Sequence, residues 1–394
     1  MHLVQKEPEK IKLVEDHGQL FVDSEINFDV VIIDGDLTLI RCVVISCEKL
    51  IISGKLTIVD GNADWMPENS IINELDITEA IDCKIRTNSI IKVANLSIHE
   101  ETELERNIIF SDELVLGVET QTLNNSHAIN GILNLNNFSG VFKWPKDFVV
   151  NKFKLITGAT EIKGLPDNLV LCGLNTMDSR TKIWPNNLTI NGDWETNQYD
   201  NISWIPKNTT IYGDLNIKHS MIRIIPESTV IYGSLIASHS KLRSIQEGAV
   251  ITEETVIDFT QITEINKNTQ YGKTLNIRNC NISRLTPWAN GSSVKVGSYI
   301  SELKLIGDFN YVSVYDGLNL NLVDSKVCAL VIHSDTLNIE PLSKIFKSKN
   351  LHVFGNALEE IESVNFYYDE LTKKVIDGII GDYHFKYVNG ILIE

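Results

Sequence analysis

The stretch TIYGDLNIKHSMIRIIP, residues 210–226, contains the signals that decide the fold of this chain. An aliphatic pair, Thr210-Ile211, precedes a glycine, and an anchor of the form Leu-x-Ile begins at Leu215. Pro226 follows that anchor leucine by eleven residues. Variants of the unit recur at intervals of roughly 20 residues, which is the signature of a repeat protein. Similar anchors begin at Leu37, Leu56, Leu75, Leu96, Leu114, Leu133, Leu275 and Leu303.

Each repeat is expected to form two short strands joined by a bend. The β-branched residues before the glycine and the alternating residues after it both favour strands with one apolar side. Glycines such as Gly213 and Gly233 permit a sharp bend between the strands. Proline has no N–H for a strand ladder, so it belongs at the corner where one turn passes to the next. We therefore predict a mainly β repeat solenoid with about two short parallel strands per turn, whose turns share one core.

The repeat also predicts the organisation of the chain. Residues 1–25 are charged and are expected to form an N-terminal cap, followed by a solenoid of roughly 20-residue repeats over 26–340 and a C-terminal repeat and cap over 341–394. Residues 341–348 suit a short helix, and Asn389-Gly390 suits the turn of a closing hairpin. Caps would keep the open ends from associating, so we expect a monomer.

The repeat resembles a known family. The segment Leu155–Pro166 follows the frame Leu-x-Ile-x4-Ile-x2-Leu-Pro with a looser third position, and Leu351-His-Val-Phe-Gly-Asn-Ala-Leu-Glu-Glu-Ile matches Leu-x-Val-x2-Asn-x-Leu-x2-Leu. Both are similar to the short leucine-rich repeats of bacterial effectors delivered by type III secretion. Ser220, Ser240 and Cys280 stand where most family repeats have asparagine. The chain is thus expected to be a leucine-rich-repeat variant or a β-solenoid with similar columns.

The resemblance implies a protein-binding scaffold. Some family members carry a C-terminal ubiquitin-ligase domain with a catalytic cysteine, but here the repeats continue nearly to the end. Cys328 lies in an apolar, strand-like run, which favours a structural role. We therefore expect the repeat-only, non-enzymatic branch of the family, with no cofactor.

Composition narrows the partners. The formal net charge is −17, from 52 acidic and 35 basic residues, so the surface should repel nucleic acid and anionic membranes. No run of apolar residues is long enough to span a membrane, and the N-terminus has no cleavable signal-peptide pattern. The six cysteines form no Cys-x-x-Cys pair and are expected to fill core positions. These features predict a protein that is cytoplasmic in the producing cell, or secreted into a host cell without a cleaved signal peptide.

Three sets of residues raise the question of chemistry. His219 and His239 occupy equivalent positions, which could give a metal pair but more often gives a surface ladder. Asp193 and Asp214 follow a bend glycine, as does Asp36; acids at such positions serve catalysis in some β-helical enzymes, but recurrence in the repeat favours a structural role. The tryptophans Trp144, Trp184, Trp194 and Trp204 occupy anchor or corner positions, which favours the core over glycan stacking.

The outward residues of the anchor strands are the candidate protein-binding face. Mixed polar, basic and apolar side chains suit recognition of a protein along an extended sheet face. We predict a non-enzymatic binding scaffold, with a glycan-binding or glycan-cleaving β-helical protein of the tail-spike kind as the alternative. The predicted face consists of Asn216, Lys218, His219, Ile236, Ser238, His239, Asn276 and Arg278.

Overall fold

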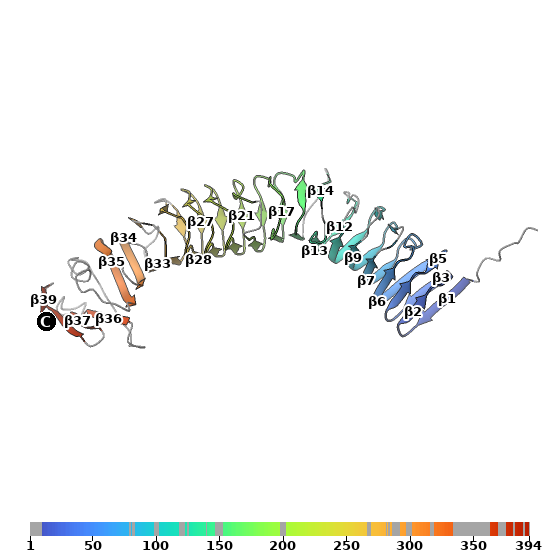
Figure 1. Ribbon diagram of the computed structural model, residues 1–394, viewed down its shortest axis with the longest axis horizontal. Helices are drawn as coiled ribbons and strands as arrows, with labels where there is room; N and C mark the ends of the chain where they lie inside the picture. Colours follow the sequence, from blue (N-terminus) through green and yellow to red (C-terminus); the bar gives the residue numbers. More distant parts are fainter. Residues whose placement is uncertain are drawn as a thin grey trace, which may run out of the picture. The chain divides into compact units, whose positions relative to one another are not determined.

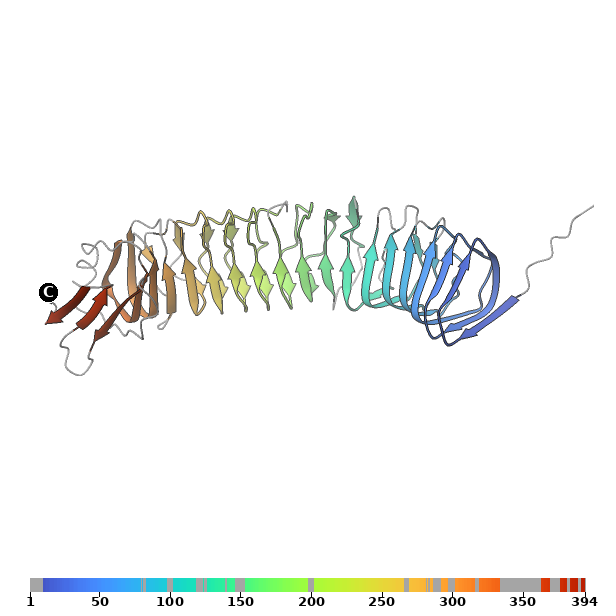
Figure 2. The same ribbon diagram turned by 60° about the horizontal axis from the view of Figure 1, so that its bottom comes forward.

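The computed structural model describes residues 10–333, with short gaps, and four strands in the region 363–393. The gaps are residues 79, 81–82, 98–101, 118–122, 124–125, 139, 146–152, 198–201, 266–268, 281, 283, 286–291, 297–301 and 316–318. All regular elements of the described residues are β strands, and most of them stack in parallel turns into a β-solenoid of about 13 turns. The mainly β repeat solenoid predicted from the sequence is confirmed. Figures 1 and 2 show the strands of successive turns side by side.

The chain forms two compact units, one of residues 1–185 with 199–201 and one of residues 186–198 with 202–394. In the first unit, the two strands expected in each turn often merge into one long strand. β6 (Lys49–Val59) and β7 (Ile71–Thr78) pair in parallel, and their register shifts between Ile52 and Lys55, where the bend was expected. The expected bend is therefore a β-bulge within one continuous strand, not a gap between two strands.

The other strands of the first unit follow the same stacking. β1 and β2 pair in parallel with β3 and β4, respectively, so strand pairing already begins within residues 1–25. These strands are β1 (Lys10–Glu15), β2 (Gln19–Val22), β3 (Glu25–Ile33), β4 (Leu37–Ile40), β5 (Val43–Val44), β8 (Cys83–Ile85), β9 (Ile90–Ser97), β10 (Thr102–Leu104), β11 (Ile109–Leu116), β12 (Ala128–Ile129), β13 (Ile132–Asn134), β14 (Val141–Lys143), β15 (Lys154–Ile156), β16 (Glu161–Lys163), β17 (Val170–Leu171) and β18 (Gly173–Asn175).

In the second unit, each of several turns contains three short strands rather than two. The anchor strands are β20 (Trp194–Glu195), β22 (Leu215–Asn216), β25 (Leu235–Ile236), β28 (Glu254–Val256), β31 (Thr274–Ile277) and β33 (Ser292–Val296). A second row consists of β23 (Ile224–Ile225), β26 (Ser244–Ile245) and β29 (Glu264–Ile265). The third row consists of β19 (Thr189–Ile190), β21 (Thr210–Ile211), β24 (Val230–Ile231), β27 (Val250–Ile251) and β30 (Gln270–Tyr271). The second row was not expected from the sequence.

The last part of the second unit changes from parallel to antiparallel pairing. β32 (Arg284–Leu285) and β33 pair with the long strand β34 (Glu302–Tyr315), which pairs in parallel with β35 (Asn319–His333). Antiparallel pairing then joins β35, β36 (Ser363–Tyr368), β37 (Ile376–Ile380), β38 (Tyr383–Val388) and β39 (Ile391–Ile393). The β38–β39 pairing confirms the closing hairpin. The expected helix at 341–348 and the repeat at 351–361 lie outside the described residues, and the boundaries at 25 and 340 stay a prediction.

Backbone register corrects several anchors. Ala94, not Leu96, pairs with Leu75 and with Leu114, because the strand begins two residues earlier than the Leu-x-Ile pattern suggests. The anchor column passes from Leu275 to Val294 and then to Val312, so Leu303 lies in a different column. Thr255 takes the place of leucine between Leu235 and Leu275. Its buried hydroxyl donates to the carbonyl of Tyr271 at 2.8 Å, which satisfies a polar group in an apolar column.

The corners close the core largely as expected. The residues at or just before the corner prolines, Met66, Trp144, Trp184, Ile205 and Ile225, are buried, and so is the anchor Trp194. Trp204 is a correction, because 46% of its surface is exposed. It stands one residue farther from its proline than Trp184 does, and alternation along the chain turns it outward.

A buried polar column satisfies the backbone at the bend after each anchor strand. Ser220 and Ser240 accept backbone N–H groups at 3.4 and 3.3 Å, and Thr260 donates to the carbonyl of Ile257 at 2.8 Å. The thiol of Cys280 donates to the same carbonyl at 2.8 Å, and burial raises the pKa of this thiol, which keeps it protonated. Hydroxyl and thiol groups thus satisfy backbone groups at these four bends.

Asparagine instead stacks at the corner of the turn, two residues after the proline at Asn69, Asn187 and Asn208 and in a turn without proline at Asn88. All four residues have positive φ, between 56° and 61°. The Nδ2 of Asn208 donates to the Oδ1 of Asn187 at 2.9 Å, and Asn88 donates to Asn69 at 3.4 Å. Asparagine tolerates the left-handed region better than most residues, which explains its recurrence at this corner.

Candidate functional site

The predicted face lies on the outer side of the anchor strands in the second unit. Along β22 the side chains alternate, since Leu215 and Ile217 are buried while Asn216 is half-buried and Lys218 is exposed. Asn216 pairs in register with Ile236, so the alternation repeats in the next turn. The apolar side chains inside the turn therefore force the polar set outward.

The first outward column differs from the prediction at two positions. Val256 belongs to the column but was not predicted, and Asn276 was predicted but is not exposed. Register continues from Ile236 to Val256 and then to Asn276. Val256 was missed because Thr255 breaks the leucine pattern beside it. Asn276 is only 7% exposed, and its Oδ1 accepts a hydrogen bond from Arg278 Nε at 3.2 Å. The accessible part of this column is therefore Asn216, Ile236 and Val256.

The second outward column begins with Lys218 and Ser238. Asp258 and Arg278, which form an ion pair, continue it in the next two turns. Asp258 and Arg278 are joined by a contact of 2.9 Å between Oδ2 and Nη2. Asp258 Oδ1 also accepts the backbone N–H of Arg278 at 3.0 Å. The Asp258 side chain is 6% exposed, whereas the side chain of Arg278 is 41% exposed. Nε and Nη2 of Arg278 both donate to Asp258 Oδ2, at 3.3 and 2.9 Å. Arg278 is thus held in place by Asp258 while part of its side chain stays exposed.

A ladder of three rings borders the face at the end of the anchor strands. The rings of His219 and His239 stack with centroids 5.2 Å apart, and Phe259 stacks on His239 at 4.4 Å. The prediction that the two histidines are neighbours in a surface ladder is confirmed. Within the described residues no group of three or more His, Cys, Asp or Glu side chains could hold a metal ion.

A second ladder borders the beginning of the anchor strands. Tyr212 and Tyr232 stack with ring centroids 4.9 Å apart and planes 12° from parallel, and about half of each side chain is exposed. These tyrosines were missed, although the Ile-Tyr-Gly triplet recurs in successive repeats, at 211–213 and 231–233. We call the two ladders, together with Asn216, Ile236 and Val256 between them, the recognition face.

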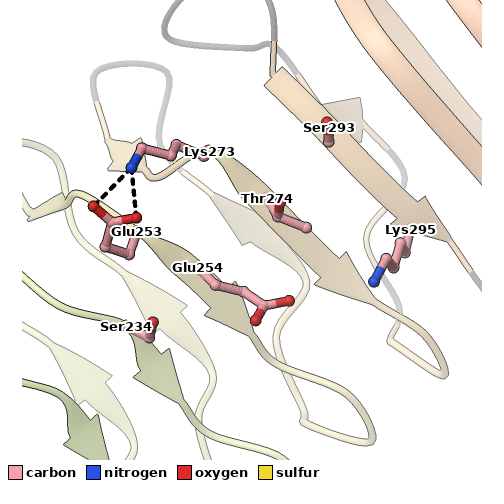
Figure 3. Close-up of a pocket in the computed structure, with 7 residues that line it drawn as sticks. All are labelled: Ser234, Glu253, Glu254, Lys273, Thr274, Ser293 and Lys295. Atoms are coloured by element: carbon pink, nitrogen blue, oxygen red, sulfur yellow. Dashed lines mark hydrogen bonds and ion pairs between the residues drawn. The ribbon is translucent and has the colours of Figure 1, made fainter.

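A shallow polar hollow of about 460 Å³ lies on the same side of the anchor strands, farther along the chain. Figure 3 shows Lys273 paired with Glu253, while Glu254 and Lys295 extend over neighbouring strands. The distances from Lys273 Nζ to the carboxylate oxygens of Glu253 are 2.8 and 2.6 Å. The remaining lining residues are Ser234, Thr274 and Ser293. Hydroxyl and charged groups make this hollow suited to polar parts of a partner.

The acids at the bend have a structural role, as expected. Asp193 Oδ1 accepts the backbone N–H of Asp214 at 2.8 Å, and Asp214 Oδ1 accepts that of Ser234 at 2.7 Å. Asp36 does the same for Lys55 at 2.8 Å. Each carboxylate thus satisfies a donor of the next turn, at a point where the strand ladder is interrupted.

The cysteines differ from the prediction at one position. Cys42, Cys47, Cys83 and Cys280 are buried, but Cys172 is exposed. The side chain of Cys328 lies outside the described residues. No helix among the described residues is long and apolar enough to cross a membrane.

Comparison with known proteins gives no relative. No family model, no curated protein and no solved structure matches this chain. The fold assignment therefore rests on the strand pairing of this chain, and the resemblance to leucine-rich-repeat effectors stays a prediction.

Proposed function

We propose that this protein is a non-enzymatic scaffold that binds another protein along the recognition face. The observation that carries the proposal is the pair of ring ladders, Tyr212–Tyr232 and His219–His239–Phe259, at the two ends of the anchor strands. Aromatic residues are enriched at protein interfaces, and here they border a strip of half-buried amide and apolar side chains, Asn216, Ile236 and Val256.

The backbone under this face is held on both sides by hydrogen bonds. Leu215 N–H donates to the carbonyl of Ser234 in the following turn at 2.9 Å, and the carbonyl of Asn216 accepts the N–H of Thr196 in the preceding turn at 3.0 Å. A flexible surface loses conformational entropy when it is ordered by a partner, and this lowers the affinity. Side chains on a backbone that strand hydrogen bonds already hold lose less entropy on binding. This supports a surface that recognises its partner without rearrangement.

The ring geometry favours a protein over a glycan. Sugars bind aromatic residues by lying on an open ring face. In the ladders the planes are 8° to 16° from parallel, so the rings cover one another's faces and present mainly edges outward. Ring edges carry imidazole nitrogens and phenol hydroxyls, which suit hydrogen bonds to peptide groups.

A peptide selection tests the proposal. Phage-displayed random peptides would be selected on the whole protein, and the binders compared on Ile236→Lys, with Ile71→Lys as the matched control. Ile71 is 47% exposed and belongs to the first unit, whereas the recognition face belongs to the second. We expect peptides that lose at least tenfold in affinity on Ile236→Lys alone. An empty selection, together with binding on a glycan array, would contradict the proposal.

The resemblance extends the proposal to a bacterial effector that acts inside a host cell. It is supported by the Leu-x-Val-x2-Asn match at 351–361. A translocation reporter fused to the full chain and expressed in a bacterium with a type III system would test it. Equal signal in a secretion-deficient strain would contradict the effector role and leave the binding scaffold untouched.

A further inference from the structure

A basic ridge lies beside the recognition face. Residues 217–225 and 237–245 contain four lysines or arginines and no aspartate or glutamate, in a chain with 52 acidic and 35 basic residues. All four basic side chains are exposed. We define the basic ridge as Lys218, Arg223, Lys241 and Arg243 with the ladder residues His219 and His239.

The ridge places like charges in register. Arg243 N–H donates to the carbonyl of Arg223 at 2.8 Å, so the two arginines are direct neighbours in successive turns. The backbone of Lys241 likewise bonds to that of Ser220, at 3.0 Å. Like charges directly opposite each other destabilise a sheet. This arrangement is therefore better explained by binding than by stability.

Few acids lie near the ridge in the neighbouring turns. The matching segment of the next turn, residues 257–265, contains two acids. Asp258 is bound to Arg278, and Glu264 pairs through its backbone with Ser244. Arg243 Nε donates to the neutral amide of Gln261 at 3.2 Å. Among the described residues, none of the four basic groups of the ridge forms an ion pair.

We propose that the basic ridge binds an acidic segment of the protein partner, which deepens the proposed function and rests on it. Exposed apolar side chains accompany the charges, since Met221, Ile224 and Phe259 are 38%, 39% and 49% exposed. An acidic segment with interspersed apolar residues fits this mixture. A nucleic acid is a less suitable partner, because the net charge of −17 would repel it at long range.

Charge reversal tests the ridge in the whole protein. Fluorescence anisotropy would measure binding of a labelled peptide of about twelve residues that alternates Asp-Glu with Phe-Leu. The test variant is Arg223→Glu with Arg243→Glu, and the control is Lys49→Glu with Lys207→Glu, which changes the net charge equally at exposed sites elsewhere. Circular dichroism would verify that both variants fold.

We expect the test variant to lose about tenfold or more in affinity and the control less than twofold. Equal losses, or no loss, would overturn the ridge proposal, as would tighter binding of single-stranded DNA or a sulfated oligosaccharide at the ridge. Peptides from the selection that depend on Ile236 but not on the two arginines would overturn the ridge and leave the scaffold function standing. Absence of any peptide binding would contradict both.

Discussion

The imidazole rings of His219 and His239 lie face to face, 16° from parallel, with centroids 5.2 Å apart. Both residues have a positive φ, of 61° and 60°, and Phe259 continues the column with a φ of 55°. Because the left-handed bend recurs in each turn, equivalent side chains leave the backbone in the same direction and meet. The ladder is thus a consequence of the repeat, and it forms one side of the recognition face.

The backbone at the ladder predicts how Phe259 responds to substitution. A β-branched residue is strained in the left-handed region, by about 1–2 kcal/mol, whereas asparagine tolerates it. Loss of ring stacking costs about 0.5–1.5 kcal/mol in either case. We expect Phe259→Val to lower the free energy of unfolding by about 2 kcal/mol and Phe259→Asn by about half of that or less, measured by urea denaturation. Equal losses would contradict the role of the backbone.

Gly233 should not tolerate a side chain. A Cβ added there would lie 2.5 Å from the carbonyl oxygen of Gly213 and would also meet Asp214 Oδ1. We expect Gly233→Ala to lower the free energy of unfolding by more than about 2 kcal/mol, because backbone of the neighbouring turn would have to move. Gly248→Ala serves as the comparison, since its Cβ would meet nothing closer than 3.9 Å, so its loss comes from the strain of a φ of 85° alone, about 1–2 kcal/mol. A thermal melt in which both variants match the natural protein would refute the close approach.

Thr160 should be needed for its hydroxyl rather than for its volume. Its Oγ1 is buried within reach of two carbonyls, Leu135 at 3.0 Å and Phe138 at 2.7 Å. Thr160→Val keeps the shape but removes the donor, and we expect a loss of about 1–3 kcal/mol. Thr160→Ser keeps the donor and should lose less. If chemical denaturation ranked the serine variant below the valine variant, packing would be the larger contribution.

The burial of His127 predicts that the protein loses stability at acidic pH. His127 is 6% exposed, its Nε2–H donates to the carbonyl of Glu105 at 2.5 Å, and burial lowers its pKa. Because the folded pKa lies below that of the unfolded chain, about 6.5, this contribution is full above pH 6.5 and is lost as the pH falls through the folded value. Denaturation at pH 7.5 and 5.0 should show a smaller difference for His127→Gln than for the natural protein. An unchanged difference would assign the acid sensitivity to other groups.

The candidate site shows where prediction from sequence succeeds and fails. His219 and His239 were placed as neighbours because identical spacing guarantees equivalent positions in a solenoid. Val256 was missed because a threonine in the anchor column, Thr255, hides the register. Asn276 was wrongly expected to be exposed, because the side chain of Arg278, which is paired with Asp258, covers its amide. Trp204 was assigned to the core, although a shift of one residue relative to Trp184 turns it outward. A sequence motif that allows variable spacing cannot detect a shift of one residue.

The sequence by itself determined the period, the strand-bend-corner order of each turn and the parallel stacking, because β-branched runs, glycines and prolines restrict the backbone locally. Only the tertiary structure decided that Ala94 rather than Leu96 stands in the anchor column, that the second row of strands, β23, β26 and β29, forms, and that rings and basic side chains line up outside the turns. The reason is physical. Register between turns is set by backbone hydrogen bonds to the neighbouring turn, and a shift of one residue reverses which side chains face the core.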